Sequence, residues 1–206
     1  MAEVIDPIRN RRARRAFDPR PVPQDVREAL WTAVSLAPSH GNNQPTRIVT
    51  AVSEAARAAL TAALSSGNRH WASAAPLLAA VCSIPGHDLV QENSDGSTRE
   101  LWAFHGGIAV GNLLAQATAM GLTAHPMAGF DEPAVRGALG VPGGVRVLTV
   151  VAIGYPGDVE RLVADLQKRE TAPQRRLPID HVAADDRWRP EQSLSMKEYR
   201  DRTAPR

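Results

Sequence analysis

The chain has 206 residues, of which 43% are hydrophobic and 22% charged, and its formal net charge at pH 7 is +2. This size and composition fit one globular domain rather than a disordered chain. No apolar run is long enough to span a membrane, and the nearly balanced charge argues against nucleic acid as the main partner. The single cysteine, Cys82, cannot form an internal disulfide, and residues 1–10 lack the apolar core of a signal peptide. We therefore expect a cytoplasmic protein with neither a membrane nor a nucleic-acid partner.

Four arginines crowd residues 11–15, directly after a short helix expected over residues 4–10. Charges this close repel one another unless an anion or a counter-charge lies between them. One interpretation is a phosphate site in which Arg11 and Arg15 grip the anion. The alternative is a solvated basic segment or an arm that contacts RNA. The residues alone leave both open.

A polar stretch, Ala-Pro-Ser-His-Gly-Asn-Asn-Gln-Pro-Thr-Arg at residues 37–47, follows an amphipathic helix predicted over residues 24–36. Its prolines and glycine prevent a regular helix. Its amides, hydroxyl and imidazole could hold a planar polar ligand, and a plain surface connection is the alternative. A strand is predicted over residues 46–52, and Ser53 is expected to cap a helix over residues 54–64.

The middle of the chain is predicted to alternate loops with buried elements. We expect a polar loop at residues 67–71, a strand covered on both faces over residues 77–84 and a surface loop over residues 86–96. A capping box at residues 97–100 predicts the start of a helix that runs to residue 120 and is closed by Gly121. This helix is apolar nearly all round, so its cover is either a partner subunit, which makes a homodimer, or the chain itself.

The last third carries a third irregular stretch at residues 121–130, followed by a short helix that Asp131 caps and that ends at Leu139. An apolar strand is predicted over residues 145–153 and a helix over residues 159–169. From residue 171 the chain is polar, and this tail either wraps a partner or is loose.

The six histidines show no metal-ligand spacing, and no glycine-framed elbow surrounds Ser39 next to His40. We therefore expect neither a metal site nor a hydrolase triad. His40 and His125 are candidates for the edge of a ligand pocket, and a packing or surface role is the alternative for each.

Five of these stretches, in this order, resemble motifs of the FMN-dependent nitroreductase family. They are the arginine-rich stretch (11–17), the Ala-Pro-Ser stretch that ends in Gln-Pro (37–45), the loop with Pro-Met-x-Gly-Phe-Asp (121–131), the strand that ends in Gly-Tyr-Pro (147–156) and a late Arg-Leu-Pro-Ile (176–179). The resemblance implies an α+β fold in three layers (α/β/α), with a central mixed β-sheet flanked by helices and dimerisation through the long helix. It places one FMN-binding domain over residues 1–182 and a polar tail over residues 183–206.

The resemblance also assigns cofactor contacts, and it implies no catalytic side chain because the chemistry takes place at flavin N5. The implied phosphate ligands are Arg11, Arg15 and Arg176, with Arg12 at the phosphate or ribityl edge and Ala13 in the place of the usual serine. The implied flavin and ribityl contacts, from the other subunit, are Pro38, Ser39, His40, Asn42 and Gln44, joined by Asn68. The residues implied to line the ring are Pro126, Met127, Ala128 and Gly129, with the backbone N–H of Ala128 facing N5. Two further departures from the family pattern are Thr46, where tryptophan is frequent, and His105, where an acidic residue is common.

The implied activity is FMN-dependent oxidation of NADH or NADPH, with hydride passing through flavin N5 to a nitroaromatic, a quinone or another electron-poor small molecule. Two alternatives remain open. One is a flavin-binding or flavin-sequestering protein of the same fold without efficient turnover. The other is an arginine-rich nucleic-acid binder, which would show a steep salt dependence of its affinity.

Overall fold

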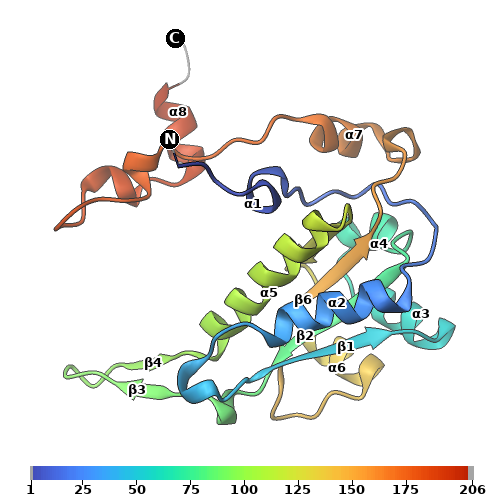
Figure 1. The fold of residues 1–206 in the computed structure, drawn as a ribbon, viewed down its shortest axis with the longest axis horizontal. Helices are drawn as coiled ribbons and strands as arrows, with labels where there is room; N and C mark the ends of the chain where they lie inside the picture. Colours follow the sequence, from blue (N-terminus) through green and yellow to red (C-terminus); the bar gives the residue numbers. More distant parts are fainter. Residues whose placement is uncertain (1, 204–206) are drawn as a thin grey trace. The chain divides into compact units, whose positions relative to one another are not determined.

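The computed structural model describes residues 2–203 and divides into two compact units, which meet in the sequence between Glu170 and Thr171. Figure 1 traces both units. The domain boundary expected near residue 182 remains a prediction.

The first unit is built on a four-stranded sheet in the order β1-β2-β6-β5. The strands are β1 (Thr46–Ala51), β2 (Leu77–Ser83), β5 (Thr123–Met127) and β6 (Arg146–Gly154). Every pairing in this sheet is antiparallel within the described residues, whereas the resemblance implied a mixed sheet. All residues of β2 are buried, as its continuous apolar sequence predicts for a strand covered on both faces.

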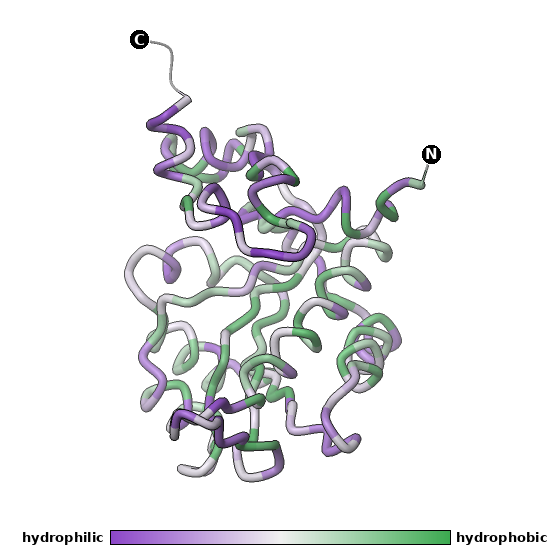
Figure 2. Tube along the Cα trace, turned by 90° about the vertical axis from the view of Figure 1, so that its left-hand side faces the viewer, coloured by the Kyte–Doolittle hydropathy of each residue, from purple (hydrophilic) through white to green (hydrophobic). Residues whose placement is uncertain are grey.

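Helices cover both faces of the sheet, so the α+β fold and its three layers are confirmed. The helices of the first unit are α1 (Asp6–Asn10), α2 (Gln24–Ser35), α3 (Glu54–Ala62), α4 (Ser66–Ala72), α5 (Trp102–Ala119), α6 (Glu132–Leu139) and α7 (Ala164–Thr171). Alternate residues of β2 belong to separate cores, because successive side chains of a strand point to opposite faces. Leu77 and Val81 pack with α2 and α5, whereas Leu78 and Cys82 pack with α3, α4 and α6. In Figure 2 the hydrophobic colour accordingly runs through the central strands.

Local capping signals are confirmed at two helices. The Ser53 hydroxyl accepts from the Ala56 amide at the start of α3, and the Asp131 carboxylate accepts from the Ala134 amide at the start of α6. Gly121 follows α5 with φ of +72°, the left-handed conformation that suits a glycine at this place.

Four sequence expectations are wrong. Residues 67–71 lie in helix α4 rather than a loop, because Trp71 is buried in the core and its indole N–H donates to the Gly67 carbonyl at 3.0 Å. Residues 123–127 form strand β5 rather than irregular structure; His125 and Pro126 are not residues that strand sequences usually contain. Residues 86–96 are not a plain loop but lead into a hairpin of β3 (Val90–Glu92) and β4 (Thr98–Glu100), so residues 97–100 are no capping box. The helix predicted over residues 159–169 is divided into a short 3₁₀ turn, Val159–Arg161, and α7.

The long helix α5 is buried on one face only. Gly106 lies on that face, and a Cβ there would stand 2.1 Å from Leu148 Cδ1, so glycine permits the close approach of β6. On the other face Phe104 is 62% exposed, and Gly107 and Gly111 are exposed with nothing near their Cβ positions. The described residues therefore leave one face of this apolar helix open.

The second unit contains two 3₁₀ turns, Ile179–His181 and Pro190–Ser193, and helix α8 (Met196–Thr203). No residue of these three elements is buried.

Candidate functional site

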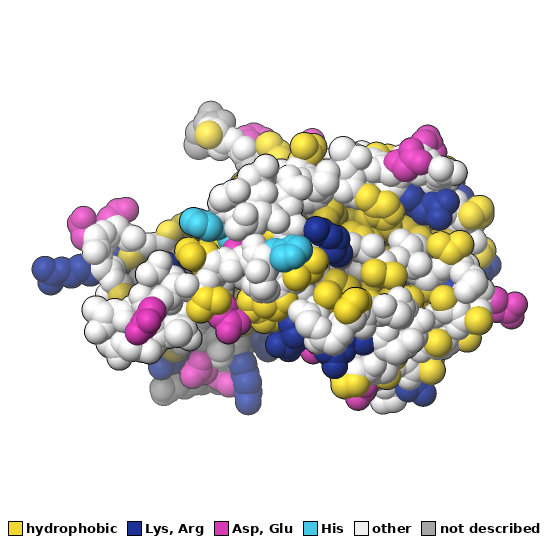
Figure 3. Space-filling model, turned by 90° about the horizontal axis from the view of Figure 1, so that it is seen from below, with side chains coloured by type: hydrophobic (Ala, Val, Ile, Leu, Met, Phe, Trp, Pro, Cys, Tyr) yellow, Lys and Arg dark blue, Asp and Glu magenta, His cyan; other side chains and the backbone are white. Residues whose placement is uncertain are grey.

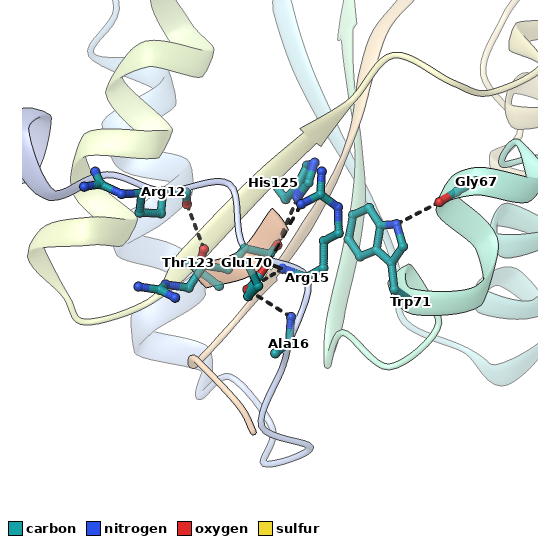
Figure 4. A network of polar contacts seen from close by, with 9 residues as sticks. Arg12, Arg15, Ala16, Gly67, Trp71, Thr123, His125 and Glu170 are labelled. Carbon is teal, nitrogen blue, oxygen red and sulfur yellow. Dashed lines mark hydrogen bonds and ion pairs between the residues drawn. The ribbon is translucent and has the colours of Figure 1, made fainter. Parts of the chain in front are cut away.

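The arginine segment, residues 11–15, runs beside strand β5 and is held there through alternate carbonyls (Figure 4). The Thr123 hydroxyl donates to the Arg12 carbonyl at 3.0 Å, and His125 Nδ1 lies 2.9 Å from the Arg14 carbonyl. Because a carbonyl only accepts, the His125 proton that faces it is on Nδ1. Thr123 and His125 are two positions apart on a strand and project to the same face. The strand therefore fixes the backbone that carries the arginines.

Glu170 anchors the end of the same segment, and sequence reasoning missed it. Its side chain is only 1% exposed, and the carboxylate accepts from the Arg15 amide at 2.9 and 3.1 Å and from the Ala16 amide at 3.3 Å. Arg15 Nη1 is 3.9 Å from the same carboxylate. The contact joins residues 155 positions apart, so no local pattern could reveal it.

An aromatic pair lies against the arginine segment. The rings of Trp71 and His125 are 4.5 Å apart between centroids, and Arg15 Cζ lies 5.8 Å from the Trp71 centroid. The pKa of His125 is lowered from 6.5 to about 4: burial is the main cause, the charges of Arg15 and Arg11 add to it, and the hydrogen bond to the Arg14 carbonyl opposes them. His125 is thus neutral at pH 7, and its defined role is to donate a hydrogen bond to the segment.

The loop predicted to face the flavin ring, residues 126–129, is tied to the start of α4. The Gly129 carbonyl accepts from the Ser65 amide at 2.9 Å and from the Asn68 side-chain amide at 3.1 Å. A Cβ at Gly129 would stand 2.5 Å from Ser65 Oγ, so the two chains meet closely. Asn68, predicted as a flavin contact, holds this loop. Within the loop Met127 is buried, Pro126 and Gly129 are partly exposed, and Ala128 is exposed.

The polar turn, residues 38–44, contains a backbone conformation that is uncommon for residues other than glycine. Asn42 and Gln44 have φ of 55° and 46°, in the left-handed region, next to Gly41 at 56°. Inside the turn the Ser39 hydroxyl accepts from the Gln44 amide at 2.8 Å, and the Gln44 side-chain amide donates to Asn42 at 3.1 Å. Non-glycine residues held at positive φ occur preferentially at functional sites. The exposed members of the predicted set here are Pro38, His40, Asn42 and Gln44.

A cavity of about 310 Å³ opens beside the polar turn. Its lining combines the turn with α2, β1 and the start of α5: Trp31, Val34, Ser35, Ala37, Pro38, Ser39, Gln44, Pro45, Thr46, Arg47, Ile48 and His105. Figure 3, which views the molecule from below, shows basic, acidic and hydrophobic side chains interspersed rather than one continuous basic surface on that face.

The arginine segment and the polar turn lie at opposite ends of the sheet. The polar turn leads into Thr46, which pairs with Ser83, and Ser83 in turn pairs with Arg146 at the beginning of β6. The arginine segment is fixed by Thr123, which pairs with Gly154 at the other end of β6. Eight residue steps along β6 correspond to ~26 Å. Within one chain, β5 holds the arginine segment and leads into the loop at residues 126–129. The polar turn of the same chain lies at the other end of the sheet.

The remaining residues of the predicted phosphate site are partly or fully exposed. Arg11 and Arg12 are partly exposed, and Arg12 Nη1 donates to the Arg11 carbonyl at 3.0 Å. Ala13 is exposed. Arg176 belongs to the second unit, where its Nη1 donates to the Arg175 carbonyl at 2.7 Å.

Residues 2–203 contain no group of three or more His, Cys, Asp or Glu side chains arranged to hold a metal ion. No helix of this range combines the length and the apolar character that crossing a membrane requires.

Comparison with known proteins identifies the family. The model of the nitroreductase family matches residues 8–155. A solved structure described as an oxidoreductase containing FMN superposes with a TM-score of 0.80 at 32% identity, covering 91% of this chain and 94% of its own. An NADH dehydrogenase of Thermus thermophilus is 29% identical over 204 residues, 87% of this chain and 92% of the relative. An uncharacterised 15.4 kDa protein of Mycolicibacterium smegmatis is 39% identical over 131 residues, 63% of this chain and 82% of the relative. The family match spans the sheet, the arginine segment and the polar turn, and the chain belongs to the nitroreductase family.

Proposed function

We propose that this protein is an FMN-dependent oxidoreductase that oxidises NADH or NADPH and reduces an electron-poor small molecule such as a nitroaromatic or a quinone. The observation that carries the proposal is the arginine segment, whose backbone is fixed by Thr123, His125 and Glu170 while its side chains stay partly exposed. The FMN content of a similar solved structure and the names of the relatives support it. When bound, the flavin supplies the hydride chemistry, so no side chain need act as acid, base or nucleophile.

The donor set of the segment fits a phosphate monoester. Arg11 and Arg15 present planar guanidinium groups suited to two-pronged hydrogen bonds with phosphate oxygens, and we assign Arg12 to the phosphate or ribityl edge. Arg15 is only loosely paired with Glu170, at 3.9 Å, which leaves its guanidinium able to turn toward an anion. Arg176 is proposed as a further ligand. Ala13 supplies no hydroxyl, so the arginines carry this contact alone.

The loop at residues 126–129 is suited to orient a flat ring. Ser65 and Asn68 hold the Gly129 carbonyl, and the exposed Ala128 presents backbone rather than a bulky side chain at the surface. We assign the Ala128 N–H to flavin N5 and Pro126, Met127 and Gly129 to the ring wall. A fixed amide dipole there needs no rearrangement when charge develops on the ring.

We propose that a homodimer completes the site. The polar turn stands at the far end of β6 from the arginine segment of its own chain, and a second copy can bring the missing turn to it. The open face of α5, with Phe104, Gly107 and Gly111 exposed, is the surface we assign to the contact. The turn residues assigned to the flavin and ribityl chain of the opposite subunit are Pro38, Ser39, His40, Asn42 and Gln44.

The phosphate assignment is tested by a matched pair of arginine variants. Arg11→Ala is expected to weaken FMN binding by about ten-fold or more, because a charge-assisted hydrogen bond contributes about 1.5–3 kcal/mol. Arg14→Ala, which removes a guanidinium without an assigned phosphate contact, is expected to stay within about two-fold of the parent protein. The measurement is the dissociation constant of FMN, by quenching of flavin fluorescence. Equal losses in both variants would show that the phosphate assignment is wrong.

A further inference from the structure

A buried acid–histidine pair stands beside the polar turn. His105 Nδ1 lies 2.5 Å from Asp88 Oδ2, and the two side chains are 7% and 1% exposed. On the other side of the ring, the backbone N–H of His40 donates to His105 Nε2 at 3.2 Å. The Asp88 carboxylate is itself held by the Leu89 amide at 2.8 Å, at the base of the β3–β4 hairpin.

These contacts leave one protonation pattern for the imidazole. His105 Nε2 faces an N–H donor and must present its lone pair. The ring proton is therefore on Nδ1, where it is donated to the Asp88 carboxylate. Asp88 thus selects the tautomer that makes His105 an acceptor for the His40 amide.

The acceptor matters because the polar turn has few bonds to the rest of the protein. Its internal bonds join Ser39 with Asn42 and Gln44, and these could persist in a turn that moves as a unit. The His105 contact links His40, inside the turn, to α5, 65 positions away. At the other end Arg47 Nη1 donates to the Gln44 carbonyl at 2.7 Å, and the Ile84 amide donates to the Pro45 carbonyl at 3.0 Å. Residues at positive φ persist only where their surroundings hold them.

We propose that His105, with Asp88 behind it, is a positioning residue: it holds the His40 amide and so presents Asn42 and Gln44 to the flavin. The proposal rests on the proposed function, and His105 itself is assigned no contact with the cofactor. The pair links the base of the hairpin to the site.

The test separates the two hydrogen bonds of the imidazole. His105→Asn keeps a donor near the Nδ1 position, so the buried Asp88 stays paired, but it removes the acceptor at Nε2. His105→Gln with Asp88→Asn keeps an acceptor near Nε2 and replaces the buried charge by an amide. His87→Asn, at an exposed neighbouring histidine, is the control.

Two readouts are measured on the full chain: hydrogen exchange of the amides at residues 38–44, by mass spectrometry, and the dissociation constant of FMN. We expect His105→Asn to speed exchange in the turn by about five-fold or more and to weaken FMN binding by a similar factor, the usual effect of losing one hydrogen bond. The double variant and the control are expected to stay within about two-fold of the parent protein in both readouts.

Parental exchange and parental FMN affinity in His105→Asn would overturn the proposal, and so would equal losses in the double variant. If the parent protein binds no FMN, the proposed function fails. The exchange of the turn in His105→Asn then decides the positioning role alone: faster exchange supports it, and unchanged exchange overturns it.

Discussion

Replacing Glu170 tests whether a buried charge holds the arginine segment in place. In Glu170→Gln the side-chain oxygen can still accept from the Arg15 and Ala16 amides, at the places where the carboxylate lies 2.9 and 3.3 Å away. The new NH₂ group, however, meets the Arg15 amide at the position of the second oxygen, 3.1 Å away, where two donors repel. The change from charge-assisted to neutral hydrogen bonds and the lost acceptor together cost about 1–2 kcal/mol in free energy of unfolding. Glu170→Ala leaves both amides without their acceptor and is expected to cost about 2–5 kcal/mol.

The assay is urea unfolding followed by circular dichroism at neutral pH. Glu160→Gln is the matched control, because this acid is exposed and lies in the preceding 3₁₀ turn, and its change is expected within about 0.5 kcal/mol. A Glu170→Gln variant as stable as the control would refute the anchoring role, since the carboxylate would then contribute no more than a solvated acid.

Three further predictions use other buried groups. The pKa of His125 is about 4 in the folded protein and 6.5 when unperturbed, so between these pH values the unfolded state binds more protons. The free energy of unfolding is therefore expected to fall by up to about 2 kcal/mol as the pH drops from 7 to 5. Urea titrations of His125→Gln should not show this contribution to the loss. Gly106→Ala is expected to lower the free energy of unfolding by about 1–3 kcal/mol, because the new Cβ would meet Leu148. Gly137→Ala, where a Cβ would have nothing within 4 Å, is the control and should not be destabilised. Thermal unfolding of both variants measures the difference. Burial raises the pKa of Cys82 to about 11, so a thiol reagent should label it only after unfolding, and rapid labelling of the native protein would contradict its place in the core.

Much of the fold could be predicted because it depends on local patterns. The caps at Ser53 and Asp131 act on amides three residues away, and the apolar run of β2 reports burial on both faces directly. Helix α4 was missed because its place depends on one tertiary anchor, Trp71, and not on apolar periodicity. Strand β5 was missed because His125 looked like a loop residue, although its side chain bonds to a distant carbonyl.

The candidate site shows the same division. The arginine segment and the polar turn stand out in the sequence because charge and hydrogen-bonding groups are concentrated there. The residues that hold these two segments do not stand out. Glu170 contacts Arg15 across 155 positions, and His105 contacts His40 across 65 positions while it is paired with Asp88, so only folding brings these residues together. His105 was noted only as a departure from the family pattern.

The central claim is that the arginine segment, the loop at residues 126–129 and the polar turn of a second copy together hold one FMN, which exchanges hydride with a nicotinamide. Its most direct test is the visible absorption spectrum of the purified protein, loaded with FMN and then mixed with NADH or NADPH without oxygen. We predict a band at about 450 nm, which belongs to the oxidised flavin ring and disappears when NADH or NADPH is added. A band that persists would indicate a flavin-binding protein without turnover, and a protein that stays colourless after incubation with FMN would contradict the account.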